Sequence, residues 1–171
     1  MPDTPYATLI TASAPIATSS HGGRAKCLQR LVRLDLPVPC TVALSFSAVQ
    51  NAAAGELPDL AAILGEFSED ALLCVRPSSE VPDWGGPSAI LNIGMNDARY
   101  VSLCDSLGKE AASSLYLRFV QSYAVHVARL DPDAFDDVEE GGPDALREIL
   151  QAYEAEADEV FPQDPGEQLA A

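Results

Sequence analysis

The pattern of apolar positions predicts short strands and helices at the front of the chain. Residues 6–11 and 41–44 are rich in β-forming side chains and predict two strands. Between them, the small-residue stretch 17–23 is expected to be a loop, and the apolar positions of 24–34 recur at helical spacing. The prolines of 36–39 end this predicted helix, because proline and the residue before it disfavour helical geometry.

A third strand is predicted at 71–76, an apolar run that ends in a charge. This pattern is typical of a buried strand, and it places Arg76 at the strand's end. The proline- and glycine-rich stretch 77–87 then predicts an exposed loop, and 90–93 predicts a brief fourth strand.

Local start and stop residues predict the remaining helices. Ser45 or Ser47 can cap a short helix, and a second short helix follows at 60–64. Asp97 is expected to cap a helix that Gly108 ends. The helices of the back part are predicted at 97–107, 110–130 and 143–160.

These elements predict an α/β (α+β) fold with one compact core, for which 171 residues suffice. We expect an α/β part at 1–96, a helical subdomain at 97–160 and a C-terminal tail at 161–171. The start lacks the basic region of a secretory leader, and no stretch approaches the roughly 20 apolar residues of a membrane span.

The net charge of the chain limits the classes of binding partner to be expected. With 10 basic and 26 acidic residues the net charge is −16, which argues against nucleic acid or an anionic membrane as the main partner. Residues 131–171 hold 14 of the acids and the single base Arg147. Lys26, Arg30 and Arg33 share one face of the first predicted helix. This face is either solvated, which is the commoner case, or open to the acidic tail or to an acidic partner.

The four cysteines form no CxxC pair and have apolar neighbours in the sequence. This pattern is typical of buried small hydrophobic residues rather than of a disulfide or zinc framework. We therefore expect Cys27, Cys40, Cys74 and Cys104 to be buried, and the protein to work in a reducing cytoplasm.

A glycine turn precedes the first predicted helix. Gly22 and Gly23 let the backbone approach a ligand, the free N–H groups of a helix start favour a phosphate, and Arg24 adds positive charge. A glycine pair before a helix is more often a plain turn, however, so the residues alone leave both interpretations open.

Two other residues have candidate roles. Arg76, at a strand end, lies where α/β proteins often contact ligands, although an ion pair with Glu80 or Asp83 is an equal alternative. Trp84 is the only tryptophan, and it either stacks on a base or protein partner or folds back over the core.

Several of these segments together resemble the nucleotide-binding domain of the pyruvate phosphate dikinase family. HisGlyGlyArgAla (21–25) and LeuAspLeuProValPro (34–39) are similar to its GlyGlyLysGly turn and LeuGlyLeuProValPro-type phrase. ValArgProSer (75–78), TrpGlyGlyProSerAla (84–89) and LeuAsnIleGlyMetAsnAsp (91–97) are similar to its ValArgSerGly strand end, glycine loop and LeuAsnLeuGlyLeuAsnAsp phrase. A helix segment at 114–123 and PheProGlnAspPro (161–165) extend the resemblance, which is collinear over nearly the whole chain.

The resemblance implies an ATP-grasp-like N-terminal lobe, with flanking helices on its sheet and a three-helix insertion. It implies that Arg24 and Arg76 contact ATP phosphates and that the glycine loop closes over them. The implied nucleotide-binding residues are Gly22, Gly23, Arg24, Arg76, Gly85 and Gly86. No catalytic or metal-ligating residue is assigned.

The departures from the family pattern limit the expected chemistry. Arg24 stands where the family has lysine, and 86–89 lacks the family loop's aspartate and threonine. The chain also ends before the lobe that holds the family's magnesium ligands. We therefore expect an ATP-binding module that uses magnesium only with a second lobe supplied in trans, and that does not transfer phosphoryl groups alone.

The alternative is a non-catalytic regulatory or interaction protein that keeps the fold. The expected partners are a second copy of the chain or a dikinase chain that supplies the second lobe.

Overall fold

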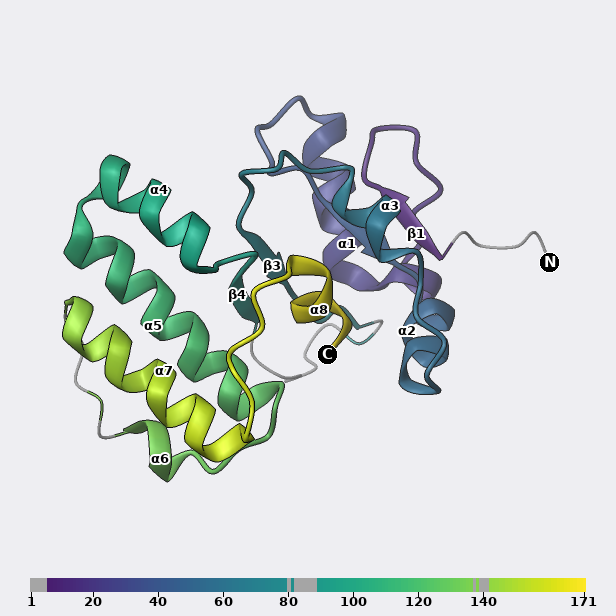
Figure 1. Cartoon of the computed structure of the whole chain (residues 1–171). Helices are drawn as coiled ribbons and strands as arrows, with labels where there is room; N and C mark the ends of the chain where they lie inside the picture. Colours follow the sequence, from purple (N-terminus) through teal and green to yellow (C-terminus); the bar gives the residue numbers. More distant parts are fainter. Residues whose placement is uncertain (1–5, 80, 82–88, 137, 139–141) are drawn as a thin grey trace. The chain divides into compact units, whose positions relative to one another are not determined.

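The computed structural model combines helices with two small antiparallel sheets, which confirms the predicted α+β class (Figure 1). It describes residues 6–79, 81, 89–136, 138 and 142–171. The chain divides into two compact units: unit 1 comprises 1–69 and 77–88, and unit 2 comprises 70–76 and 89–171. The division predicted from the sequence, at residues 96 and 160, stays a prediction.

The described residues of unit 1 form a two-stranded sheet and three helices. Its elements are β1 (Ala7–Leu9), α1 (Thr18–Arg33), β2 (Val42–Leu44), α2 (Phe46–Ala53) and α3 (Leu60–Leu64). The strands are antiparallel, with Thr8 opposite Ala43. Of the two serines expected to cap α2, Ser45 does so, since its Oγ accepts the Ala48 N–H at 3.2 Å.

The first helix begins earlier than predicted. The stretch 17–23 was expected to be a loop, but α1 already begins at Thr18. The glycine turn nevertheless interrupts the helix, because Gly22 has φ 82° and ψ 169° and joins two helical pieces across a kink.

The basic face of α1 holds the preceding loop in place. Lys26 Nζ donates to the Ile16 carbonyl at 2.7 Å, and Arg33 Nε donates to the Ala12 carbonyl at 2.7 Å. The buried Gln29 amide donates to the carbonyls of Thr11 and Ala14 at 3.1 and 2.6 Å. Two of the three cations on this face therefore satisfy carbonyl groups of the protein itself.

Unit 2 combines a two-stranded sheet with five helices among its described residues. Its elements are β3 (Leu73–Val75), β4 (Ile90–Ile93), α4 (Asp97–Leu107), α5 (Lys109–His126), α6 (Asp133–Asp136), α7 (Pro143–Ala157) and α8 (Pro165–Ala170). Figure 1 shows α5 between α4 and α7. Helices α6 and α8 were not predicted from the sequence. None of the described helices is both long enough and apolar enough to cross a membrane.

The third strand is less buried than its sequence suggests. Its pairing with β4 sets Leu73 opposite Ile93 and Cys74 opposite Leu91. Cys74, Val75 and Arg76 are exposed, so the predicted buried strand is wrong. An apolar run indicates burial on both faces only when layers cover both faces, and within unit 2 this strand does not meet that condition.

The prediction of buried cysteines is also wrong. Cys27, Cys40 and Cys74 are exposed and Cys104 is partly buried. Apolar neighbours in a sequence do not bury a residue, because successive side chains point in different directions, around the axis of a helix or to opposite faces of a strand.

Asn96, rather than Asp97, caps α4, and its Oδ1 accepts the Arg99 N–H at 2.8 Å. Gly108 ends this helix with φ 85°, as predicted.

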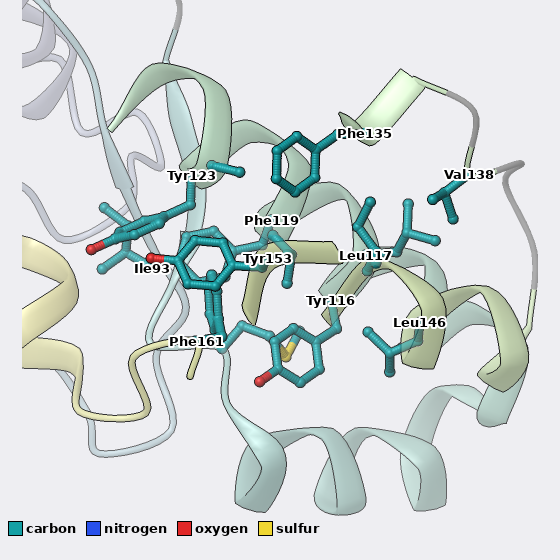
Figure 2. Packing of buried hydrophobic residues seen from close by; sticks show 14 residues of the cluster. Ile93, Tyr116, Leu117, Phe119, Tyr123, Phe135, Val138, Leu146, Tyr153 and Phe161 are labelled. Atoms are coloured by element: carbon teal, nitrogen blue, oxygen red, sulfur yellow. The ribbon is translucent and has the colours of Figure 1, made fainter. Parts of the chain in front are cut away.

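The core of unit 2 is an aromatic cluster around Phe161 (Figure 2). The Phe161 ring lies edge-on to the rings of Tyr116, Phe119, Tyr123 and Tyr153, at centroid distances of 5.9, 5.5, 5.3 and 5.1 Å. Edge-to-face pairs at such distances add stability beyond the area that they bury. The segment predicted as a tail thus begins with a residue at the centre of the core.

Candidate functional site

The glycine turn of α1 contacts the segment that directly follows Arg76 in the chain. The Gly23 N–H donates to the Ser79 carbonyl at 2.8 Å, and Arg24 Nη1 donates to the Pro77 carbonyl. Both contacts lie within unit 1. The phrase 21–25 therefore meets residues 77 and 78, the part of the phrase 75–78 that belongs to unit 1.

Gly22 is what allows this close approach. A Cβ at this position would overlap Ser78 Oγ and would lie 2.9 Å from the Ser79 nitrogen. Its φ of 82° is also one that L side chains rarely adopt. The glycine expected to bring backbone close to a ligand thus brings it close to the protein's own backbone.

Two buried polar atoms beside the turn lack a hydrogen-bond partner among the described residues. These atoms are Ser78 Oγ and Nε2 of His21, whose side chain is 1% exposed. The other ring nitrogen, Nδ1, lies 2.9 Å from Ser20 Oγ. Buried unpaired polar atoms are uncommon in native proteins, so each requires an explanation such as strain, an ordered water or a ligand.

Burial disfavours protonation of the histidine at this turn. Burial lowers the pKa of His21 below its usual value, and a hydrogen bond with the Ala17 backbone opposes this shift to a smaller extent. Sequence reasoning did not assign this residue a role. Its position directly before the glycine pair was the available signal.

The other predicted site residues lie elsewhere. Arg76 is exposed and follows β3 in unit 2, whereas Gly22, Gly23 and Arg24 belong to unit 1. Gly85 and Gly86 of the glycine loop lie outside the described residues, as do Glu80, Asp83 and Trp84. The structure therefore brings together the first turn and the segment 77–79, each within unit 1.

Two further phrases that resemble the family meet inside unit 2. Gln163 Oε1 accepts the Asp97 N–H at 2.9 Å, and Asn96 Nδ2 donates to the Gln163 carbonyl at 2.9 Å. Gln163 Nε2 also donates to the Tyr116 hydroxyl at 3.1 Å. These contacts join 91–97 to 161–165, so both phrases have a structural role here. Asp164 followed by Pro165 was the sequence signal for the helix that follows.

Each unit has a surface hollow among its described residues. The hollow in unit 1 has a volume of about 150 Å³ and is lined by residues that include Tyr6, Asn51 and Leu57. The hollow in unit 2, about 340 Å³, lies among α4, α5 and α7 and includes Tyr100 and Lys109. Neither hollow includes a predicted site residue. No cluster of three metal-ligating side chains occurs among the described residues.

Comparison with known proteins supports a relationship to dikinases over part of the chain. No family model matches. The chain is 38% identical over 79 residues to a pyruvate, phosphate dikinase of Rickettsia felis. The aligned segment covers 46% of this chain and 9% of that protein. The chain is 25% identical over 193 residues to the enzyme of Giardia intestinalis, which covers 92% of this chain and 22% of that protein. The chain thus shows weak, partial homology to pyruvate phosphate dikinases and spans a quarter or less of their length.

Proposed function

We propose that this chain is a dikinase-related module that binds the phosphates of ATP at the turn Gly22–Arg24. The role of Arg76 as a second cation is proposed from the resemblance alone. The observation that supports this proposal best is the bond of 2.8 Å from the Gly23 N–H to the Ser79 carbonyl. It brings the glycine turn together with residues 77–79 inside unit 1. The unpaired Ser78 Oγ and His21 Nε2 add two polar groups beside the same turn.

The chemistry of the turn suits a polyphosphate. A backbone N–H at a helix start carries partial positive charge, and Gly23 supplies such a group after the kink at Gly22. The planar guanidinium of Arg24 can bind two phosphate oxygens at once, which partly offsets the loss of the family's lysine. The loop with Gly85 and Gly86, whose role rests on the resemblance alone, would cover the bound phosphates.

The module is proposed to bind rather than to react. Phosphoryl transfer depends on metal ions that neutralise the developing charge, and we assign no metal ligand in this chain. Magnesium would accompany ATP, and full coordination would come from a second lobe supplied in trans.

Calorimetric titration of Mg–ATP tests the proposal. We expect saturable binding that weakens about 10- to 100-fold in Arg24→Ala and in Arg76→Ala, because a hydrogen bond to a charged group contributes about 1.5–3 kcal/mol. Arg30→Ala is the matched control, since it removes an exposed arginine from the same helix as Arg24. Equal affinity in Arg24→Ala and Arg30→Ala, or no binding to the parent protein, would contradict the proposal.

One observation favours the interaction protein as a second candidate. In unit 2, Val75 and Leu91 are 45% and 53% exposed, so the short sheet presents apolar side chains to solvent. A second copy of the chain could cover them. Sedimentation of the parent protein and of Leu91→Thr tests this function: a dimer that dissociates in the variant supports it, and a monomer at all concentrations contradicts it.

A further inference from the structure

We infer that residues 77–79 form a latch, a segment that closes the glycine turn from within, so that a polyphosphate binds only after the latch has opened. This inference rests on the proposed function, because it concerns how access to the same turn is regulated. The inference adds that the backbone of residues 77–79 competes with the polyphosphate for the glycine turn.

The latch uses the donors that a phosphate would need. The Gly23 N–H is directed at the Ser79 carbonyl at 2.8 Å, and Arg24 donates to the Pro77 carbonyl. A single N–H has one good direction for a strong hydrogen bond, so Gly23 cannot serve Ser79 and a phosphate oxygen equally well. Latch and ligand therefore exclude one another.

The closed arrangement requires the residue types found on both sides of it. Gly22 accepts the latch because it has no Cβ to meet Ser78. Pro77 restricts the backbone where the latch begins. At the other end, Ser79 Oγ accepts the Val81 N–H at 3.1 Å, which turns the chain after the latch.

The closed arrangement also leaves groups unsatisfied, which makes opening less costly. When the latch is closed, Ser78 Oγ and His21 Nε2 are buried and have no hydrogen-bond partner among the residues that the structure describes. Such groups lose their hydrogen bonds to water and gain none in return. Opening the latch would return Ser78 to water. The exposed Arg24 could then exchange the Pro77 carbonyl for a phosphate oxygen with little change in packing.

Two substitutions shift the equilibrium between the closed and the open latch in opposite directions, and neither changes Gly23 or Arg24. Pro77→Gly keeps the carbonyl but loosens the backbone, and it favours the open form. Ser78→Ala removes the unpaired hydroxyl, and it favours the closed form. Ser102→Ala, on the exposed face of α4 in unit 2, is the control for the serine change.

The first measurement is amide exchange of Gly23 by NMR in the ligand-free proteins. We expect Gly23 to be protected in the parent, less protected in Pro77→Gly and more protected in Ser78→Ala. If the Gly23 amide of the parent exchanges at the rate of a free amide, the latch is overturned, whether or not ATP binds.

The second measurement is the association rate of a fluorescent ATP analogue with magnesium, by stopped flow. We expect the association rate to be several-fold higher in Pro77→Gly and about tenfold lower in Ser78→Ala, because one unpaired buried hydroxyl changes an equilibrium by about tenfold. The dissociation rate should be unchanged in both variants. A faster dissociation rate in Ser78→Ala would show instead that Ser78 contacts the ligand, and would overturn the gate.

The two proposals fail in different ways. Binding with equal association rates in all four proteins overturns the gate and leaves the proposed function intact. Absence of binding in all four overturns the proposed function and the gate that depends on it, while the exchange data still report whether residues 77–79 are closed.

Discussion

The side-chain amide of Gln168 binds the backbone of Gly94, whose N–H donates to Gln168 Oε1 at 2.7 Å across 74 residues of sequence. The Nε2 of the same amide donates to the carbonyls of Met95 and Pro162, at 2.9 and 2.7 Å. Gln168 is only 3% exposed. One side chain therefore satisfies three backbone groups and fastens α8 to the end of β4.

The Gln168→Leu substitution should destabilise the protein by about 2–4 kcal/mol. Leucine fills a similar volume but leaves the Gly94 N–H and two carbonyls without partners, and each buried group left unpaired costs about 1–3 kcal/mol. Urea unfolding followed by circular dichroism measures the change. Gln151→Leu, on the exposed side of α7, is the control. Equal midpoints for the two variants would show that the amide makes no net contribution.

The aromatic core should depend strongly on its central ring. Phe161→Ala should cost about 3–5 kcal/mol, because it removes a buried phenyl ring and leaves a cavity among the surrounding rings. The neighbouring Val160 is 69% exposed, so Val160→Ala should change stability by less than about 0.5 kcal/mol. Thermal unfolding of both variants tests this, and a small loss in Phe161→Ala would mean that 161–171 does not belong to the folded core.

The position of Phe161 shows what the sequence could and could not predict. Ser45 and Gly108 act within a few residues, so their roles at helix ends could be predicted from local pattern. Whether Phe161 is a tail residue or a core residue depends on rings contributed by α5 and α7. Sequence periodicity carries no information about such contacts.

The same limit applies to the candidate site. The sequence identified the glycine turn and Arg24, because glycine pairs and helix starts have local signatures. It did not predict that Arg24 would donate to Pro77, 53 residues away, since nothing near either residue specifies the pairing. The exposure of Cys74 was missed for a related reason: burial of a strand depends on the layers that cover it.

Asp164 should contribute to stability as a helix cap. Its Oδ1 accepts the N–H groups of Gly166 and Glu167 at 2.8 and 3.0 Å, which are otherwise unpaired at the start of α8. Asp164→Ala should therefore cost about 1 kcal/mol, whereas Asp164→Asn should retain most of the stability. Chemical denaturation of the pair tests this. Equal losses in both variants would assign the effect to the negative charge rather than to the cap.

His21 should make stability depend on pH below neutrality. Burial lowers the pKa of this histidine in the folded protein, whereas in the unfolded chain it titrates near its ordinary value of about 6.5. The unfolded state therefore binds the proton first. The contribution of neutral His21 to the free energy of unfolding is fully present above about pH 6.5 and is lost as the pH falls toward the folded-state pKa. The free energy of unfolding then changes by at most about 1.4 kcal/mol per pH unit.

Unfolding free energies at pH 8 and pH 5 test this for the parent, His21→Gln and His126→Gln. Carboxylates contribute a background that all three proteins share, so the decisive quantity is the difference between variants. The fall in stability between the two pH values should be smaller in His21→Gln than in the parent. The control His126→Gln removes the exposed histidine at the end of α5 and shows the effect of losing an imidazole elsewhere in the chain. An equal fall in all three would mean that His21 is not buried beside the glycine turn, and would remove one of the two unpaired groups on which the latch depends.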